Sequence, residues 1–473
     1  MKNWCKYLPQ IIAYAIVLAL FILTCNNSFY WDTIQLGSQH ANYFFDNGFT
    51  NLLPDNLDSG HIPSFGMYIA VIWKIFGRNL LISHLAMLPF ILGIVWQLNS
   101  LTRRYIDLKY SAWAALLILI DPTLLAQMTL VSPDIVLVFF FLLAINSILG
   151  KRRSVLALAI IMLFLVSMRG MMVSFCLMIF DIIINVDFKS EKKSAVKNTS
   201  KIIVYYLPAL LVFIIFSIIH FKVKGWIGFH AGSPWAGSFE RVNILGFMRN
   251  ILIYAWRLID FGRIGIWIVA GIIIVKYRSL ALKDERNKSL LLIFSITFLI
   301  LPINMLWANN LLQHRYLLPI FILFALWVQS ALFSEHISKS LRSILITVWT
   351  TALIGGNLII YPDSISQGWD ASLAYLPINN LRHEAVKYLD NEGIKIEDVQ
   401  AEFPFFESFH CIDLNKDYRE FAPYQNNKKH VFYSNLCNLK RNTREEIFRE
   451  YKVIKRFEHC GVYIDIYRKN GSD

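Results

Sequence analysis

Long apolar runs separated by short polar stretches occupy the first three quarters of the chain. A membrane-crossing helix needs about 20 mainly apolar residues, and eleven runs reach or approach this length. No small-residue cleavage site follows the first run, so we expect it to remain as a membrane anchor. The runs lie near residues 9–25, 80–101, 106–121, 134–149, 153–168, 171–186, 202–220, 260–276, 289–307, 316–333 and 342–361. The pattern predicts a polytopic α-helical membrane protein with about eleven transmembrane helices.

Two shorter segments follow the first run and show a different pattern. Residues 32–48 and 63–76 carry apolar positions at helical offsets, for example Ile34, Ala41 and Phe44 on one face of the first segment. Segments of this length are too short to cross the bilayer, whereas an amphipathic helix can lie in its surface. We therefore expect interfacial helices within the first external loop, residues 26–79.

Composition and charge agree with a membrane protein. Only 17% of the residues are charged and the mean hydropathy is +0.47, whereas soluble domains carry about a quarter charged residues. The net charge of +13 raises the alternative of nucleic-acid binding. However, 20 of the 30 Lys and Arg residues within 1–361 fall in loops on one side of the predicted membrane, with only six acids. This distribution follows the positive-inside rule, so the charge indicates topology and not a nucleic-acid partner.

The same rule orients the chain. It places the N-terminus in the cytoplasm and residues 26–79, 221–259 and 362–473 outside it. We expect a multi-pass integral protein of a bacterial inner (plasma) membrane, with residues 1–361 as its transmembrane domain.

The C-terminal part, residues 362–473, lacks long apolar runs and forms a separate predicted domain. Cys411, Cys437 and Cys460 lie here, and one disulfide with one remaining thiol is an option whose pairing the spacing does not reveal. Helices are predicted near 381–389 and 442–450, and strands near 430–434, 453–457 and 461–467. These elements predict a small extracytoplasmic α/β domain.

Two acids at the predicted outer ends of helices are candidate catalytic residues. Asp32 follows the first run, and Asp134 opens a later one within Ser132-Pro133-Asp134. A carboxylate at the membrane edge can take a proton from an acceptor hydroxyl. The alternative interpretation of both is a helix N-cap, a position that Asp favours. The spans themselves are nearly bare of charge, which disfavours an ion or proton relay.

Basic and polar residues in the same external regions are candidates for binding a donor phosphate. Arg315 and Tyr316 lie where an external loop re-enters the membrane, and Arg169 lies in a tight external turn. A guanidinium fork suits phosphate oxygens. The alternative is that the arginines only anchor the helices at the interface. His61, in the first external loop, is either a phosphate partner or a solvated loop histidine.

Three more external residues are candidates for acceptor or sugar binding: Asp58, His230 and Trp235. Aromatic rings stack on sugar faces, but they also favour membrane interfaces. The sequence has no Walker loop, GxGxxG or Cys/His zinc pattern, so no cofactor is assigned. A divalent metal stays open, although the acids after the first run form no Asp-x-Asp pair.

The order of these elements resembles that of the GT-C membrane glycosyltransferases, over about residues 1–361. The nearest branch holds the protein O-mannosyltransferases and the lipid A aminoarabinose transferase. The matching elements are Asp32 after the first span, Gly60-His61-Ile62-Pro63 between two surface helices, Asp134, and Arg315-Tyr316-Leu317-Leu318-Pro319. The resemblance implies inverting transfer of a sugar from a polyprenyl-phosphate donor to an external glycan, lipid or protein. It also implies that Asp32 is the general base, that Asp134 supports it or orients the acceptor, and that Arg315 and Tyr316 hold the phosphate.

Two positions depart from the family pattern. The acidic pair often seen after the first span is Asp32-Thr33 here, and the usual double-proline element is His61-Ile62-Pro63. Two other functions remain alternatives. One is a polysaccharide polymerase or ligase that uses lipid-diphosphate-linked glycans. The other is a transporter or flippase, which would need functional charges in mid-span.

Overall fold

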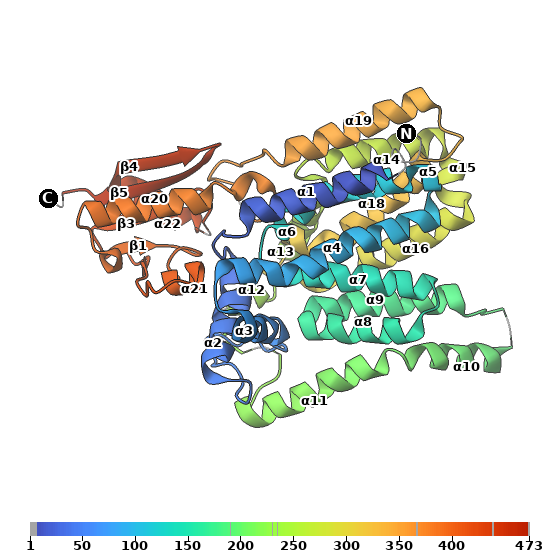
Figure 1. Cartoon of the computed structure of the whole chain (residues 1–473), viewed down its shortest axis with the longest axis horizontal. Helices are drawn as coiled ribbons and strands as arrows, with labels where there is room; N and C mark the ends of the chain where they lie inside the picture. Colours follow the sequence, from blue (N-terminus) through green and yellow to red (C-terminus); the bar gives the residue numbers. More distant parts are fainter. Residues whose placement is uncertain are drawn as a thin grey trace.

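The computed structural model describes residues 7–189, 191–228, 230–233, 235–365, 368–437 and 439–471. The predicted cytoplasmic N-terminal residues 1–6 lie outside this part. A bundle of long helices fills one end of the molecule, and a small domain with a β-sheet extends from the other end (Figure 1). This arrangement confirms a mostly helical chain with a small C-terminal sheet.

The bundle helices follow the apolar runs, and several begin with a proline in the first turn, where the missing N–H costs no hydrogen bond. They are α1 (Leu8–Thr24), α4 (Leu80–Tyr105), α5 (Leu108–Leu119), α6 (Pro122–Met128), α7 (Pro133–Leu149), α8 (Arg153–Val166), α9 (Met168–Asn185), α10 (Lys192–Ile203), α11 (Leu207–Lys224), α13 (Ile244–Ile259), α14 (Ile264–Lys276), α15 (Arg278–Lys283), α16 (Glu285–Ile300), α18 (Leu318–Leu332) and α19 (Lys339–Gly356). The short helices α12 (Ala236–Phe239) and α17 (Ile303–Leu306) lie in the connections between bundle helices.

Five helices in the described part of the chain are long and apolar enough to cross a membrane, and two bent helix pairs raise the number to seven. One bent pair joins α5 to α6 at 72°, and the other joins α13 to α14 at 86°. Helices α1, α7 and α8 are apolar but have at most 17 residues. The predicted count of eleven spans is therefore not confirmed and stays a prediction.

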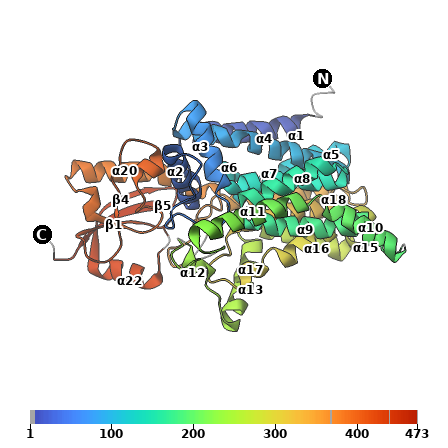
Figure 2. The ribbon, with the colours of Figure 1, turned by 90° about the horizontal axis from the view of Figure 1, so that it is seen from below.

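The predicted first external loop forms two helices, as its apolar pattern indicates, and their position in the membrane surface stays a prediction. A π-helical turn, η2 (Ile34–Gln39), continues into α2 (His40–Asn47), and α3 (Ser64–Phe76) packs against both. The two helices approach closely at Gly66, where an added Cβ would lie 2.3 Å from the Cβ of His40. Both views place α2 and α3 at the end of the bundle that carries the C-terminal domain (Figures 1 and 2).

The C-terminal domain contains a five-stranded mixed sheet in the order β2-β1-β3-β5-β4. Its central strands pair β1 with β3 in parallel and β3 with β5 in antiparallel. The strands are β1 (Val399–Ala401), β2 (Ala422–Pro423), β3 (His430–Ser434), β4 (Tyr451–His459) and β5 (Val462–Lys469), and the helices are α20 (Ile378–Asn391), α21 (Phe409–Asp413) and α22 (Arg441–Glu450). The three predicted strands and two predicted helices are present. The sequence did not reveal β1 and β2, because strands of three and two residues show no periodicity.

The three cysteines of this domain are free thiols. Burial raises the pKa of Cys437 to about 12 and that of Cys411 to about 11. Both therefore stay protonated at neutral pH.

Candidate active site

An unusual backbone turn aims Asp32 into the molecule. Trp31 has a φ of 57°, a left-handed conformation that is rare for a bulky residue. Its indole ring packs against Trp369 at 4.5 Å and Phe403 at 5.1 Å between ring centroids. The following helix η2 has Thr33 as its N-cap, without a side-chain capping bond. The Asp32 carboxylate instead contacts Arg315, so its contacts are not those of a helix cap.

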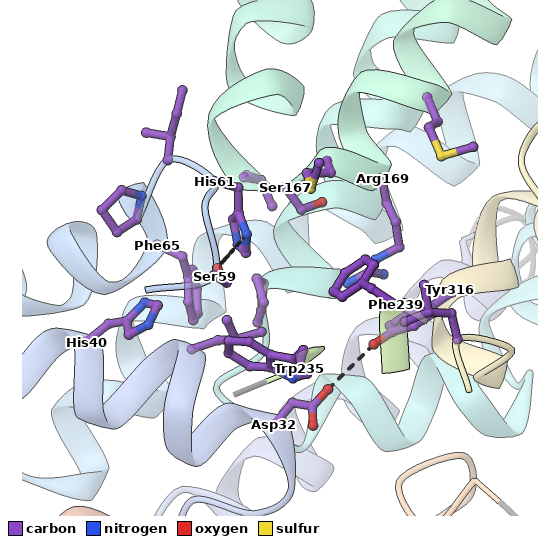
Figure 3. A pocket seen from close by; sticks show the side chains of 18 of the residues that line it. Asp32, His40, Ser59, His61, Phe65, Ser167, Arg169, Trp235, Phe239 and Tyr316 are labelled. Carbon is purple, nitrogen blue, oxygen red and sulfur yellow. Dashed lines mark hydrogen bonds between the residues drawn. The ribbon is translucent and has the colours of Figure 1, made fainter. Parts of the chain in front are cut away.

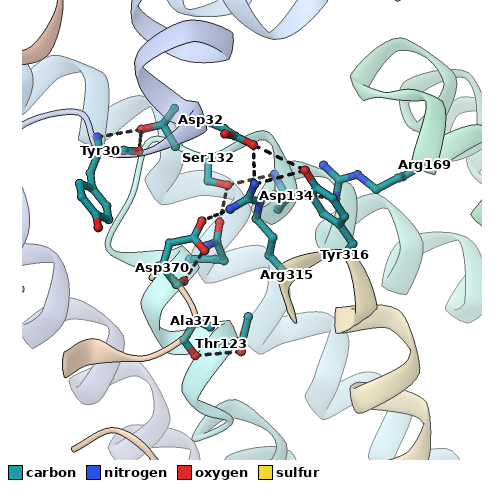
Figure 4. A network of polar contacts seen from close by, with 12 residues as sticks. Tyr30, Asp32, Thr123, Ser132, Asp134, Arg169, Arg315, Tyr316, Asp370 and Ala371 are labelled. Carbon is teal, nitrogen blue, oxygen red and sulfur yellow. Dashed lines mark hydrogen bonds and ion pairs between the residues drawn. The ribbon is translucent and has the colours of Figure 1, made fainter. Parts of the chain in front are cut away.

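Arg315 lies at the centre of a cluster of three carboxylates (Figure 4). Its two Nη atoms contact Asp32 and Asp370, and its Nε lies 3.4 Å from Asp134 Oδ2. The Arg315 side chain is only 4% exposed. Tyr316 joins the cluster through its hydroxyl group, which accepts a hydrogen bond from Arg315 Nη2 at 3.2 Å and donates to Asp32 at 3.5 Å.

Asp370 is the member of this cluster that was missing from the sequence prediction. It lies beyond the last predicted span, in a segment without periodicity, and 55 residues from Arg315 along the chain. One feature could have indicated it, because Trp369-Asp370 repeats the dipeptide Trp31-Asp32.

Arg169 is the second arginine of the site. Its Nη1 contacts Asp134, and its guanidinium lies over the Tyr316 ring, 3.8 Å from the centroid. Asp134 is free for this contact because Ser132 caps α7 and accepts the Asp134 N–H at 3.2 Å. Arg169 itself is held in the first turn of α9, which Ser167 caps. Asp134 therefore supports both arginines.

A cavity of about 120 Å³ brings together five of the residues predicted from the sequence. Its lining includes Asp32, His61, Arg169, Trp235 and Tyr316. Figure 3 shows them around one space, with Ser59, His40, Phe65 and Phe239 completing the wall. The loops that were predicted to be external, although far apart in sequence, thus meet at one end of the bundle.

The remaining predicted residues do not line this cavity. Arg315 and Asp134 lie directly behind it, within the carboxylate cluster. Asp58 accepts hydrogen bonds from the Gly60 N–H at 2.8 Å and from His220 at 3.0 Å, which ties the first loop to the end of α11. His230 packs beside Trp226 at 4.2 Å. Acceptor binding by Asp58 and His230 stays a prediction.

A second hollow of about 820 Å³ adjoins the cavity, and the two share Met172 and Asn304 in their linings. Its other lining residues are mainly apolar, from α9, α16 and the region of α17, and include Phe175, Ile303 and Trp307. Because Ile303 and Trp307 are exposed, this hollow opens on the outside of the bundle.

The cavity lining contains a small number of titratable side chains, and burial shifts the pKa of several of them. Burial raises the pKa of Asp32, the charge of Arg315 opposes this rise, and Asp370 and Asp134 add to it. Burial also lowers the pKa of His61 to about 4, so this ring is neutral at pH 7 and hydrogen bonds to Ser59 at 2.6 Å. His40 is neutral for the same reason. The acidic and basic side chains in the described lining, besides these two histidines, are Asp32 and Arg169.

Among the described residues, no group of three or more His, Cys, Asp or Glu side chains is arranged to hold a metal ion. The acids of the cluster contact guanidinium groups instead.

A helical bundle with two helices on its first long loop and an acidic site beneath them has the fold of ArnT, a GT-C structure. The chain is similar to the crystal structure of ArnT from Cupriavidus metallidurans bound to undecaprenyl phosphate, with a TM-score of 0.55 and 11% identity over 96% of this chain and 97% of that chain. The apo state of the same protein matches with a TM-score of 0.54 and 10% identity over the same shares.

A weaker similarity, with a TM-score of 0.40 and 14% identity, extends to an oligosaccharyltransferase from Archaeoglobus fulgidus over 75% of this chain and 55% of that chain. No protein-family model matches the sequence, and no curated protein matches it. The predicted GT-C fold is confirmed by the ArnT structures.

Proposed function

We propose that the protein is an inverting glycosyltransferase that moves a sugar from a polyprenyl-phosphate donor to a glycan, lipid or protein at the outer membrane face. The observation that carries this proposal is the position of Asp32. Its carboxylate keeps 19% of its surface exposed and lines a cavity opposite the neutral His61, beside Arg169 and Tyr316. A raised pKa makes a carboxylate a stronger base, as general base catalysis requires.

The proposed reaction needs one proton acceptor and one stabiliser of negative charge. An acceptor hydroxyl oxygen attacks the anomeric carbon on the face opposite the phosphate, and Asp32 takes the hydroxyl proton. The bond between the anomeric carbon and the phosphate oxygen breaks, and the lipid monophosphate leaves with the electron pair. Arg169 stabilises the negative charge that develops on the leaving group. Attack from the opposite face inverts the anomeric configuration.

Arg169 is a better candidate for the phosphate contact than Arg315. Three nitrogens of Arg315 already face carboxylates, and Arg315 does not line the cavity. Arg169 contacts Asp134 through one Nη atom and lines the cavity. A single lining arginine suits one phosphate group, which favours a monophosphate donor over the lipid-diphosphate donor of a polymerase or ligase.

The surroundings of the cavity suit the other parts of such a donor. Trp235 offers an aromatic face to a sugar ring, and the neutral pair Ser59–His61 offers hydrogen bonds to its hydroxyl groups. The adjoining apolar hollow, which shares Met172 and Asn304 with the cavity, offers a surface for the prenyl chain.

The test compares two Asp→Asn variants in the same loop. Asp32→Asn should lower the conversion of lipid-linked sugar to lipid monophosphate by roughly 10²–10⁴-fold, the usual contribution of a general base. Asp55→Asn is the control, because its side chain is 64% exposed and pairs with Lys224 at the surface. The measurement is mass spectrometry of lipid-linked sugars and lipid phosphates in membranes that contain equal amounts of each protein. Near-normal conversion by Asp32→Asn contradicts the proposal, and a lipid-diphosphate product supports the polymerase or ligase instead.

A further inference from the structure

The segment that leads from α19 into the C-terminal domain packs directly on the loop that carries Asp32. Trp369 contacts Trp31, and the Tyr375 ring stacks on Tyr30 with centroids 5.0 Å apart. Both residues that precede Asp32 therefore have an aromatic partner in this segment.

Hydrogen bonds from the region of α6 fix the backbone around Asp370. The Gln127 side chain donates to the Asp370 carbonyl at 3.0 Å, and the Thr123 hydroxyl donates to the Ala371 carbonyl at 2.9 Å. Thr129 bonds to the Tyr375 hydroxyl at 2.8 Å. The Asp370 side chain, only 4% exposed, is thereby held against Arg315.

The domain docks on the same loop a second time through α21. The Phe29 N–H donates to the Ile412 carbonyl at 2.9 Å, and the Ser28 hydroxyl donates to Asp413 at 2.5 Å. The loop that ends in Asp32 is therefore held between two parts of the C-terminal domain.

Sharing of Arg315 gives Asp370 an influence on Asp32. A guanidinium that faces a single carboxylate strongly favours its ionised form, whereas a second carboxylate on the same guanidinium repels that form. Here Asp370 occupies one Nη of Arg315 while Asp32 occupies the other, and Asp134 lies at the Nε. Asp134, Arg169 and the Tyr316 hydroxyl also face Asp32, and all three remain when Asp370 is replaced. Without Asp370, the pair of Arg315 and Asp32 would become tighter and Asp32 would become a weaker base.

We propose that Asp370 is a positioning residue that sets the orientation and charge environment of Asp32 through Arg315, so that the C-terminal domain completes the active site. This inference rests on the proposed function of Asp32 as the base. It gives the C-terminal domain a role in the reaction besides any contact with the acceptor.

The experiment is a pH–rate profile of the full-length protein in membranes, with conversion of lipid-linked sugar to lipid monophosphate as the readout. Asp370→Asn should lower the plateau rate by about 10-fold. It should also move the acidic limb of the profile, where Asp32 becomes protonated, to lower pH by about one unit. Asp370→Glu keeps the charge and should keep the limb within a few tenths of a unit of wild type. Asp390→Asn, in the same domain with its side chain 42% exposed, should match wild type in both.

The outcomes separate this inference from the proposed function. If Asp32→Asn is inactive but Asp370→Asn keeps both its rate and its acidic limb, the inference is overturned and the function stands. A lower rate of Asp370→Asn with an unchanged acidic limb shows a merely structural role of Asp370 and also overturns the inference. If Asp370→Asn does not fold, the test rests on Asp370→Glu. An acidic limb of its pH–rate profile that is displaced by a whole pH unit overturns the inference, and an unchanged acidic limb supports it. Full activity of Asp32→Asn overturns the function and the inference together.

Discussion

Truncation of the two arginines of the site should affect different properties of the protein, donor binding in one case and stability in the other. Arg169 lines the cavity and is 18% exposed, whereas Arg315 is 4% exposed and enclosed by carboxylates. We therefore expect Arg169→Ala to weaken donor binding while the fold persists, and Arg315→Ala to destabilise the fold.

The contacts of the two arginines give the expected magnitude of the loss in binding and of the loss in stability. A hydrogen bond to a charged group contributes about 1.5–3 kcal/mol, so the loss of the Arg169 contact should weaken lipid-phosphate binding by roughly 10- to 150-fold. Asp134 keeps Arg315 as a partner in this variant. Arg315→Ala instead leaves Asp32, Asp134 and Asp370 without their shared cation. The loss of one partner from a buried ion pair costs about 3–5 kcal/mol, which is a large part of the stability of most domains.

The assay measures both quantities on one set of purified variants. Native mass spectrometry gives the affinity for undecaprenyl phosphate, and thermal unfolding in detergent gives stability. Arg249→Ala is the control, because Arg249 is an exposed arginine on α13 outside the cavity lining. The reasoning is refuted if Arg169→Ala binds undecaprenyl phosphate as wild type does while a well-folded Arg315→Ala loses it. That result would indicate that Arg315, and not Arg169, binds the donor phosphate.

Two further predictions concern the stability of the external part. Burial alone would raise the pKa of Asp413, but the hydrogen bond from His383 and the charge of Arg382 lower it to about 2. The ionised carboxylate therefore adds about 2 kcal/mol above the ordinary pKa, a contribution that should be lost as pH falls from about 4 to 2. Unfolding followed against pH should show this loss in wild type and not in Asp413→Asn. Gly66→Leu should lower the unfolding midpoint and conversion together, because its side chain would meet His40 between α2 and α3. An unchanged midpoint in Gly66→Leu would show that the two helices can separate without cost.

The sequence predicted those parts of the site that depend on local pattern. Asp32, Arg169 and Tyr316 stand at the ends of apolar runs, and the ends of neighbouring spans must meet at the same membrane face. Their convergence on one cavity follows from that geometry. The helices α2 and α3 were predictable for a similar reason, because apolar positions at helical offsets mark a helix even in a segment too short to cross the membrane.

Pairings between distant segments were not predictable. Asp58 was predicted as a residue for acceptor or sugar binding, and its hydrogen bond to His220, 162 residues further along the chain, was not foreseen. Asp370 was missed in the same way, since no periodicity marks the segment around it. The predicted number of transmembrane helices is not confirmed for a different reason. Helix α8 has only 14 residues, so apolar length alone does not decide whether it crosses the membrane.

The left-handed turn at Trp31 links these distant pairings to the chemistry. Such a conformation costs about 1–3 kcal/mol in a bulky residue and persists only where surrounding contacts over-determine it. Here those contacts are Trp369 and Phe403, and both belong to the part of the chain that follows the bundle. The same packing that holds Trp31 in this conformation directs Asp32 and Asp370 onto the two Nη atoms of Arg315. If the C-terminal domain moved away, the turn would lose the contacts that offset its strain, and Asp32 would lose its fixed direction into the cavity. The proposed base is therefore held in place by residues that follow the bundle as well as by residues within it.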